Sequence, residues 1–328
     1  MPAFSTVASE GMNSSSSDPG LIALGRALQA LGYSHTTVTP ATHARVNARP
    51  ANARATDIAG VFGWSRAFDA DVLPRSLFDA ATRAGVLARD GDLWRSTVRA
   101  STLAGELFLH SAYPTTSADA VFFGPDTYRF TAALGRHLER RPTVLRAIDI
   151  GCGAGPGAVL IGRRYPGAEV LAVDINDVAL RFTASNAALA NVSNVRACRS
   201  DLLSAVEGVF DLIVANPPYL LDAHERIYRH GGGSLGEGLS LAIAGLAETR
   251  LAPGGTLLLY TGSAIFAGRD GFRDALGQYI AKSAHHWHYE ELDPDVFGEE
   301  LAEPAYAACD RIAAVLATAT ARPMPEAR

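Results

Sequence analysis

From about residue 144 onward, short apolar runs alternate with longer segments in which apolar residues recur every three to four positions. The runs VLRAIDI, EVLAVDI, VRACRS, FDLIVA and GTLLLYTG are typical of strands buried on both faces, and most segments between them are typical of helices. This alternation favours an α/β fold in which helices cover both faces of a doubly wound, mostly parallel sheet. In such sheets ligands bind beyond the carboxyl ends of the strands.

The first third of the chain has a different pattern. Residues 1–19 are rich in serine and glycine, so a disordered tail is expected there. Leucines recur at helical spacing from residue 21 to residue 31, a second helical pattern runs to Val86, and the ribbon-like stretches LWRSTVRAST and GELFLHSAY follow. We predict a helical, winged-helix-like domain over residues 20–120 that serves as a scaffold or docks a substrate, although this arrangement binds DNA in some proteins. A second domain over residues 121–322 and a tail over residues 323–328 complete the prediction.

Composition narrows the function classes. The chain has 328 residues, of which 48% are hydrophobic, enough for two domains with their own cores. A net charge of −5 gives no general attraction to nucleic acid, although a local basic face is still open. The three scattered cysteines form no CxxC pair, and no apolar stretch approaches the roughly 18 residues of a membrane span. Since no secretory signal pattern is found either, we expect a cytoplasmic protein with no membrane partner.

Three of the strand ends carry candidate ligand-binding residues. After the first strand, DIGCGAGPG begins with Asp149 and offers a tight glycine turn before a helix N-terminus, a suitable place for close backbone contact with a ligand. Proline at position 156 rules out the G-x-G-x-x-G fingerprint of dinucleotide binding. Asp174 ends the second strand and suits two ribose hydroxyls, but it could instead cap the next helix. Asp201 after the third strand could contact an adenine edge or be an ordinary turn residue.

A fourth strand end, in FDLIVANPPY, completes a set of four features. The order D-x-G-x-G-x-G at residues 149–155, the acid at 174, the Asp-Leu pair at 201–202 and N-P-P-Y at 216–219 resembles class I S-adenosylmethionine-dependent methyltransferases. The resemblance covers about residues 121 to 320 and is strongest to the release-factor glutamine methyltransferase family. It implies a Rossmann-like, seven-stranded, mostly parallel sheet, S-adenosyl-L-methionine as the cofactor, S-adenosyl-L-homocysteine as the product, and no metal. It assigns cofactor binding to Asp149, Gly151, Cys152, Gly153, Gly155, Asp174, Ile175, Asp201, Leu202 and Asn216.

By the same resemblance, N-P-P-Y is the signature of enzymes that methylate a planar nitrogen. A delocalised lone pair is a poor nucleophile, so the acceptor NH₂ must be oriented toward the methyl carbon. The Asn216 side-chain carbonyl and the Pro217 main-chain carbonyl can each accept one N–H, and two prolines make these acceptors rigid. Tyr219 would stack on the planar group. We therefore expect Asn216, Pro217 and Tyr219 to be catalytic, with Pro218, Tyr219, Arg229 and His230 contacting the substrate.

The sequence leaves the methyl acceptor open. A protein glutamine amide is the first choice; a small molecule of secondary metabolism with an amino acid or guanidine acceptor, and the amino group of guanine or adenine in a nucleic acid, are the alternatives. FFGPDTYRF at residues 122–130 and HYEELDPDVFGEEL at residues 288–301 are departures from the pattern of the glutamine methyltransferases. The run HHWHYEE alternates like an edge strand, which we favour over a metal site. The glycine-rich residues 229–238 indicate either a segment near the substrate or a simple flexible loop.

Overall fold

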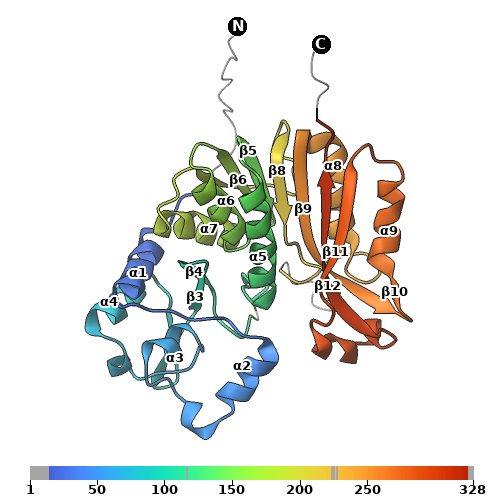
Figure 1. Ribbon diagram of the computed structural model, residues 1–328. Helices are drawn as coiled ribbons and strands as arrows, with labels where there is room; N and C mark the ends of the chain where they lie inside the picture. Colours follow the sequence, from blue (N-terminus) through green and yellow to red (C-terminus); the bar gives the residue numbers. More distant parts are fainter. Residues whose placement is uncertain (1–14, 116, 223–225, 227, 324–328) are drawn as a thin grey trace.

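The structure is a computed structural model that describes residues 15–115, 117–222, 226 and 228–323. In this part of the chain the central sheet has the strand order β11-β12-β9-β8-β5-β6-β7, and a two-residue strand, β10, pairs with β9 (Figure 1). Strands β7, β6, β5, β8 and β9 are parallel, whereas β12 is antiparallel to both β9 and β11. The predicted doubly wound, mostly parallel sheet is therefore confirmed, with β10 added. The strands are β5 (Arg146–Ile150), β6 (Glu169–Asp174), β7 (Val195–Arg199), β8 (Phe210–Ala215), β9 (Leu251–Phe266), β10 (Arg269–Asp270), β11 (His286–Asp293) and β12 (Arg311–Thr320).

Helices cover both faces of this sheet, as the apolar strands require. Consecutive residues of a strand point to opposite faces, so Ala147 belongs to the apolar cluster that includes Leu134 of α5, and Ile148 belongs to the other cluster, which includes Ile243 of α8. Both strand residues are fully buried. The helices are α5 (Pro125–Arg140), α6 (Pro156–Arg164), α7 (Asp177–Leu189), α8 (Gly238–Arg250) and α9 (Gly271–Ile280).

The strand order reverses between β5 and β8. The chain runs outward through β5, β6 and β7 and then returns to β8 on the other side of β5. The loops that follow the two neighbouring strands at such a reversal run in opposite directions. Open α/β sheets bind ligands in the crevice between these loops. Ile150 of β5 pairs with Ala215 of β8, so Gly151 and Asn216 leave the sheet next to each other. The register thus brings two of the predicted motifs together.

The N-terminal helices and hairpins pack beside α7, away from β11 and β12 (Figure 1). Leu24 and Leu28 of α1 share one apolar cluster with Phe182 and Leu189 of α7, so the N-terminal unit and the sheet domain have a continuous core. Its elements are α1 (Pro19–Ala30), α2 (Pro40–Asn47), η1 (Pro50–Asn52), α3 (Ile58–Phe62), η2 (Ala70–Val72), α4 (Arg75–Arg83), β1 (Leu87–Asp90), β2 (Leu93–Ser96), β3 (Val98–Leu103) and β4 (Glu106–Ser111).

Two local predictions for this unit need correction. The predicted ribbon is two hairpins, because β2 pairs with β1 and only β3 pairs with β4. Helix α4 ends at Arg83 rather than reaching Val86, because Gly85 has a left-handed backbone with φ of 66° and starts β1 after a sharp turn.

Residues 1–14 of the predicted tail lie outside the described residues. Asp18, however, caps α1 by accepting hydrogen bonds from the amides of Gly20 and Leu21 at 2.8 and 3.2 Å.

The C-terminal end of the sheet carries a short irregular segment. Strand β11, which contains most of HHWHYEE, lies at the sheet edge as predicted. Between β11 and β12 the chain forms η3 (Gly298–Ala302) and η4 (Pro304–Tyr306).

Among the described residues, no cluster of three or more His, Cys, Asp or Glu side chains is arranged to hold a metal ion. No described helix is long and apolar enough to cross a membrane.

Candidate active site

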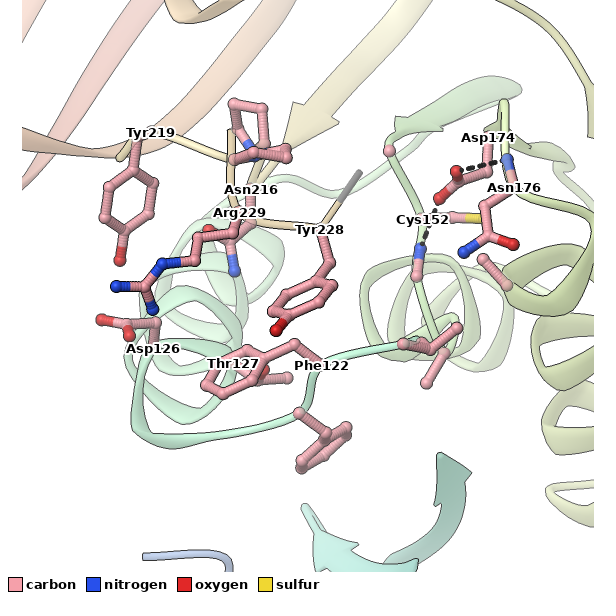
Figure 2. A pocket seen from close by; sticks show the side chains of 18 of the residues that line it. Phe122, Asp126, Thr127, Cys152, Asp174, Asn176, Asn216, Tyr219, Tyr228 and Arg229 are labelled. Atoms are coloured by element: carbon pink, nitrogen blue, oxygen red, sulfur yellow. Dashed lines mark hydrogen bonds between the residues drawn. The ribbon is translucent and has the colours of Figure 1, made fainter. Parts of the chain in front are cut away.

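A cavity of about 400 Å³ lies above the carboxyl ends of β5, β6 and β8. Figure 2 shows Asp174 at one end of it and Tyr219 and Asp126 at the other, with Asn216 between them. The residues predicted to bind a cofactor and those predicted to orient an acceptor therefore line a single space.

The glycine turn after β5 needs glycine for two different reasons. Gly151, Gly153 and Gly155 all have left-handed backbones, with φ of 69°, 57° and 82°. At Gly155 a Cβ would lie 2.8 Å from the side chain of Thr183, so this residue permits α6 to pack on α7 but does not itself line the cavity. At Gly151, which lines the cavity, a Cβ would meet no atom within 4 Å. The backbone of Gly151 is thus open to a ligand.

Asp149 lies beneath this turn and is only 2% exposed. Its Oδ2 accepts a hydrogen bond of 2.9 Å from the amide of Ala158 in the first turn of α6, where the helix dipole favours a carboxylate. Burial raises the pKa of Asp149 to about 7; the Ala158 hydrogen bond opposes this shift, and the charge of Asp174 adds to it. Asp149 therefore fixes the turn onto α6 and lines the cavity from below.

Asp174 organises the same turn from the end of β6. Its Oδ2 accepts a hydrogen bond from the amide of Gly153 at 3.0 Å, and its Oδ1 accepts one from the amide of Asn176 at 2.9 Å. The cap of α7 is Asn176, whose Oδ1 accepts from the amide of Val178 at 2.9 Å, so Asp174 is not the helix cap that its sequence position allowed. Burial raises the pKa of Asp174.

Two apolar side chains lie beside Asp174 on the cavity wall. Ile175 is 43% exposed, which is unusual for an isoleucine in a packed domain. Leu202 has a left-handed backbone with φ of 50°, a conformation uncommon outside glycine, and Asp201 next to it is exposed. Cys152 is buried at the same end, and its Sγ accepts a hydrogen bond of 3.4 Å from the Thr183 hydroxyl. An apolar surface next to a carboxylate can hold a planar ring attached to a sugar.

The N-P-P-Y turn forms the cavity wall opposite this surface, and all four of its residues line the cavity. Tyr219 is mostly buried: its ring packs on Gly262, where a Cβ would lie 2.4 Å from it, and meets Phe297 edge to face at 5.9 Å. The Tyr219 hydroxyl faces the Asp126 carboxylate. The tyrosine therefore couples the turn to two segments that lie far from it in the sequence.

Comparison with known proteins is consistent with this geometry. Residues 115–263 match the family described as methyltransferase small domain. This segment is a methyltransferase domain. The chain is 33% identical to the release factor glutamine methyltransferase of Deinococcus radiodurans over 167 residues, which cover 48% of this chain and 59% of that protein. It is 31% identical to the 4-amino-L-phenylalanine/4-methylamino-L-phenylalanine methyltransferase of Streptomyces pristinaespiralis over 153 residues, which cover 42% of this chain and 52% of that protein.

The chain therefore matches little more than half of the length of either relative. Among solved structures, the tRNA m1G37 methyltransferase of M. jannaschii aligns with a TM-score of 0.48 and 14% identity, covering 69% of this chain and 57% of that chain.

Part of the cavity is lined by the two segments that differ from the release-factor glutamine methyltransferases. Residues 122–130 contribute Phe122 and Asp126, and residues 288–301 contribute Phe297 and Glu300. None of these four was predicted as a site residue. They lie far from the strand-end motifs in sequence, so the only available signal was that both segments depart from the related family.

Asp126 is the most buried acid at this end of the cavity. The residue is only 4% exposed, and its Oδ1 accepts hydrogen bonds from the Tyr260 hydroxyl at 2.6 Å and from Arg129 at 3.4 Å. Burial raises the pKa of Asp126, and the hydrogen bond from Tyr260 partly offsets this effect.

Several described residues that follow N-P-P-Y, among them Tyr228, line the cavity. The Tyr228 hydroxyl donates a hydrogen bond of 2.7 Å to the carbonyl of Thr115, and its ring stacks on Phe122 with centroids 6.2 Å apart. Arg229, predicted to contact the substrate, lines the cavity. His230 is not among the described lining residues, and its Nδ1 instead accepts a hydrogen bond from the amide of Asp222 at 3.3 Å.

Proposed function

We propose that this protein is an S-adenosyl-L-methionine-dependent methyltransferase that transfers a methyl group to a planar or amino nitrogen. The position of Asn216 carries the proposal: the sheet register places it next to Gly151, and both line one cavity. A cofactor held by the glycine turn and an acceptor held by N-P-P-Y would therefore be neighbours, as a direct methyl transfer requires.

The residues at the β5–β6 end fit this cofactor. The open backbone of Gly151 would contact the methionine portion, and the Asp174 carboxylate would accept hydrogen bonds from the ribose hydroxyls. The exposed face of Ile175, with Asp201 and Leu202, would enclose the adenine ring. When bound, S-adenosyl-L-methionine supplies an electrophilic methyl group.

Asn216 and Pro217 would orient the acceptor nitrogen. The Asn216 side-chain carbonyl and the Pro217 main-chain carbonyl each accept one N–H, which directs the nitrogen lone pair at the methyl carbon. The acceptor nitrogen would take the methyl group of the bound cofactor, S-adenosyl-L-homocysteine would be the leaving group, and the nitrogen would release its proton to solvent. Fixed acceptors of this kind need no reorganisation during the reaction, because two prolines and a buried tyrosine hold the turn.

The cavity favours an acceptor without phosphate groups. The relatives named above act on a release-factor glutamine and on an amino-substituted phenylalanine, so both a protein amide and a small amine are represented. A polyanionic nucleic acid is disfavoured, because the described lining residues include six acids and two arginines. The carboxylates at the acceptor end of the cavity favour a small amine acceptor over the glutamine amide. The acids are Asp126, Asp149, Asp174, Asp201, Glu299 and Glu300, and the arginines are Arg226 and Arg229.

Two further predictions stand alongside this function. A cytoplasmic location rests on the cysteine pattern, and all three cysteines are free thiols in the structure. The predicted domain limits of 20–120 and 121–322 also stay predictions, and the second overlaps the family match over 115–263.

The proposal is tested by calorimetric titration of chelator-treated protein with S-adenosyl-L-homocysteine. The wild type should bind, and Asp174→Ala should bind about 10- to 150-fold more weakly, because the ribose hydroxyls lose a charged acceptor. Asp177→Ala is the control, since Asp177 is an exposed neighbour paired only with Arg199 in the described contacts. Absence of binding to the wild type would contradict the function. Equal affinity in Asp174→Ala would contradict the ribose role.

A further inference from the structure

The acceptor end of the cavity, opposite Asp174, carries more negative than positive groups. Arg129 is shared between Asp126 and Asp293, to which its distances are 3.4 and 2.8 Å. Arg226 and Arg229 are both paired with Asp222, and Arg229 also pairs with Glu300. Together with Glu299, these residues place five carboxylates and three guanidinium groups at the acceptor end of the cavity or directly behind it. The carboxylates are those of Asp126, Asp222, Asp293, Glu299 and Glu300, and the guanidinium groups are those of Arg129, Arg226 and Arg229. A ligand that brings positive charge would balance them.

One buried carboxylate oxygen of Glu300 accepts no hydrogen bond from the described residues. The residue is 5% exposed and lines the cavity. Its Oε1 accepts a hydrogen bond from Arg229, but among the described residues its buried Oε2 has no hydrogen-bond partner. The Nε of Arg229 is likewise buried without a hydrogen bond, at 3.5 Å from Asp222. A buried carboxylate oxygen without a donor is destabilising, so a donor on a bound ligand would complete the site.

Aromatic side chains line the same cavity as this carboxylate. Phe297 precedes Glu300 by one turn of η3, and its left-handed backbone, with φ of 56°, is uncommon for a bulky residue. Its ring meets Tyr219, while the stacked Phe122 and Tyr228 form another part of the wall. Carboxylates together with aromatic faces are the surroundings that favour an ammonium group, through hydrogen bonds and cation–π attraction.

We infer that the methyl acceptor is a small molecule carrying a second, protonated amino group, which binds Glu300 between the aromatic walls while Asn216 holds the nitrogen to be methylated. This inference rests on the proposed function and names its substrate class. A glutamine inside a protein chain has no ammonium group on its side chain, so it would leave the Glu300 oxygen unpaired. Two sources share the required chemistry: a free amino acid, whose carboxylate would also approach Arg229, and an amine without a carboxylate.

The inference is tested with three probes that carry the same phenyl group. Phenethylamine has only the ammonium group, L-phenylalanine has both charged groups, and N-acetyl-L-phenylalanine has only the carboxylate. Each is titrated by calorimetry into the full-length protein saturated with S-adenosyl-L-homocysteine. We expect acetylation to weaken binding at least about tenfold, because the charge-assisted hydrogen bond to Glu300 is lost. Tighter binding of L-phenylalanine than of phenethylamine identifies a free amino acid, and equal or weaker binding identifies a simple amine.

Glu300→Gln tests the named residue. The amide keeps an oxygen for Arg229 but removes the charge, so the difference between L-phenylalanine and its acetylated form should disappear. Glu303→Gln is the control, because Glu303 is exposed on the same segment and outside the cavity, and it should keep the wild-type difference. If Glu300 only anchored the loop through Arg229, all probes would weaken together. Thermal melting of both variants shows whether they fold. The comparison of the three probes in the wild-type protein does not depend on either variant.

Three results would overturn the inference: acetylated and free phenylalanine binding equally, none of the probes binding, or a difference that persists in Glu300→Gln. Each of these results is measured with protein that has been shown to bind S-adenosyl-L-homocysteine. None of them therefore contradicts the proposed function. Failure to bind S-adenosyl-L-homocysteine would instead contradict the proposed function, and this inference with it.

Discussion

The polar side chains around the cavity divide into those that hold the protein together and those that face the ligand. Asp149 is hydrogen-bonded to α6, and Asp174 spans Gly153 and Asn176, so a change at either affects the backbone as well as the ligand. Asn216 differs from them because its side chain lies in the middle of the cavity (Figure 2). A substitution at Asn216 should therefore separate catalysis from folding.

Replacing Asn216 with alanine should leave the melting temperature nearly unchanged while methyl transfer falls about a hundred- to a thousandfold, the cost of losing one fixed hydrogen-bonding group at a reacting centre. Affinity for S-adenosyl-L-homocysteine should change far less, since the principal partner of Asn216 is the acceptor. Asn216→Asp should be less damaging than alanine, because a carboxylate still accepts from N–H. Single-turnover transfer from labelled cofactor measures the effect. A variant that melts normally and methylates at the wild-type rate would refute the role.

Asp149 should make stability depend on pH. Its pKa is about 7 in the folded protein and about 3.9 in an unfolded chain, so between these values the folded state holds a proton that the unfolded state has lost. The stabilisation is therefore complete below pH 4 and is lost as the pH rises to 7. Relative to Asp149→Asn, the wild type should lose about 2 kcal/mol of unfolding free energy from pH 5.5 to 7 and little more above pH 8. Urea unfolding at several pH values measures this, and a constant difference would contradict the assignment.

At the scale of elements, the sequence predicted the strands and the motifs at their ends. It did not predict the side chains that only the tertiary fold brings to the cavity. Apolar runs define β5, β6 and β8, and the motifs at their ends follow directly, because the carboxyl ends of parallel strands meet at one edge of a sheet. Asp126 and Glu300 could not be placed this way: α5 precedes the sheet and η3 follows β11, and only the tertiary fold brings both to N-P-P-Y. Periodicity likewise could not show that β2 pairs with β1, because pairing depends on partners as well as on strand pattern.

The glycine turn offers a test at this scale. Gly155→Ala should destabilise the protein by about 2 kcal/mol or more, because alanine disfavours a left-handed backbone and its methyl group would collide with Thr183. The shifted turn should also weaken cofactor binding. Gly167→Ala is the matched control: Gly167 lies in the connection to β6, and a Cβ there meets no atom within 4 Å. Urea unfolding and S-adenosyl-L-homocysteine titration are the measurements, and equal behaviour of the two variants would show that the turn does not require glycine at 155.

On the scale of the whole molecule, the N-terminal unit is part of the cavity as well as of the core. Pro40 and Tyr113 line the cavity from that side, and Thr115 accepts the hydrogen bond that holds Tyr228 across it. A unit placed this way limits what can approach N-P-P-Y. The substrate-docking or scaffold role that the sequence favoured over DNA binding stays a prediction. The attachment of the unit to α7 should therefore affect both stability and acceptor binding.

Asn186 connects α7 to β4 of the N-terminal unit and to the glycine turn. It is fully buried in α7; its Oδ1 accepts from the amide of Leu109 in β4, and its Nδ2 donates to the carbonyls of Leu109 and Ala154, all at 2.9 Å. Asn186→Ala would leave these three backbone groups buried without partners, and we expect it to lower the unfolding free energy by about 2–5 kcal/mol. It should also weaken cofactor binding, because Ala154 belongs to the glycine turn. Asn186→Asp should be at least as destabilising as alanine, since it keeps the acceptor for the Leu109 amide but places a buried carboxylate oxygen against the carbonyls of Leu109 and Ala154.

Arg26→Ala is the control for the same interface. Arg26 is exposed on α1 and bonds the carbonyl of Ala188 and the side chain of Asn191, so its loss should cost about 0.5 kcal/mol. Urea unfolding gives the stabilities, and titration with S-adenosyl-L-homocysteine gives the affinities. If Asn186→Ala were no more destabilising than Arg26→Ala, the buried hydrogen bonds of Asn186 would contribute no more to the attachment than the exposed ones of Arg26. If it unfolded more easily but bound the cofactor as tightly as the wild type, the glycine turn would hold its shape without the bond from Asn186 to Ala154.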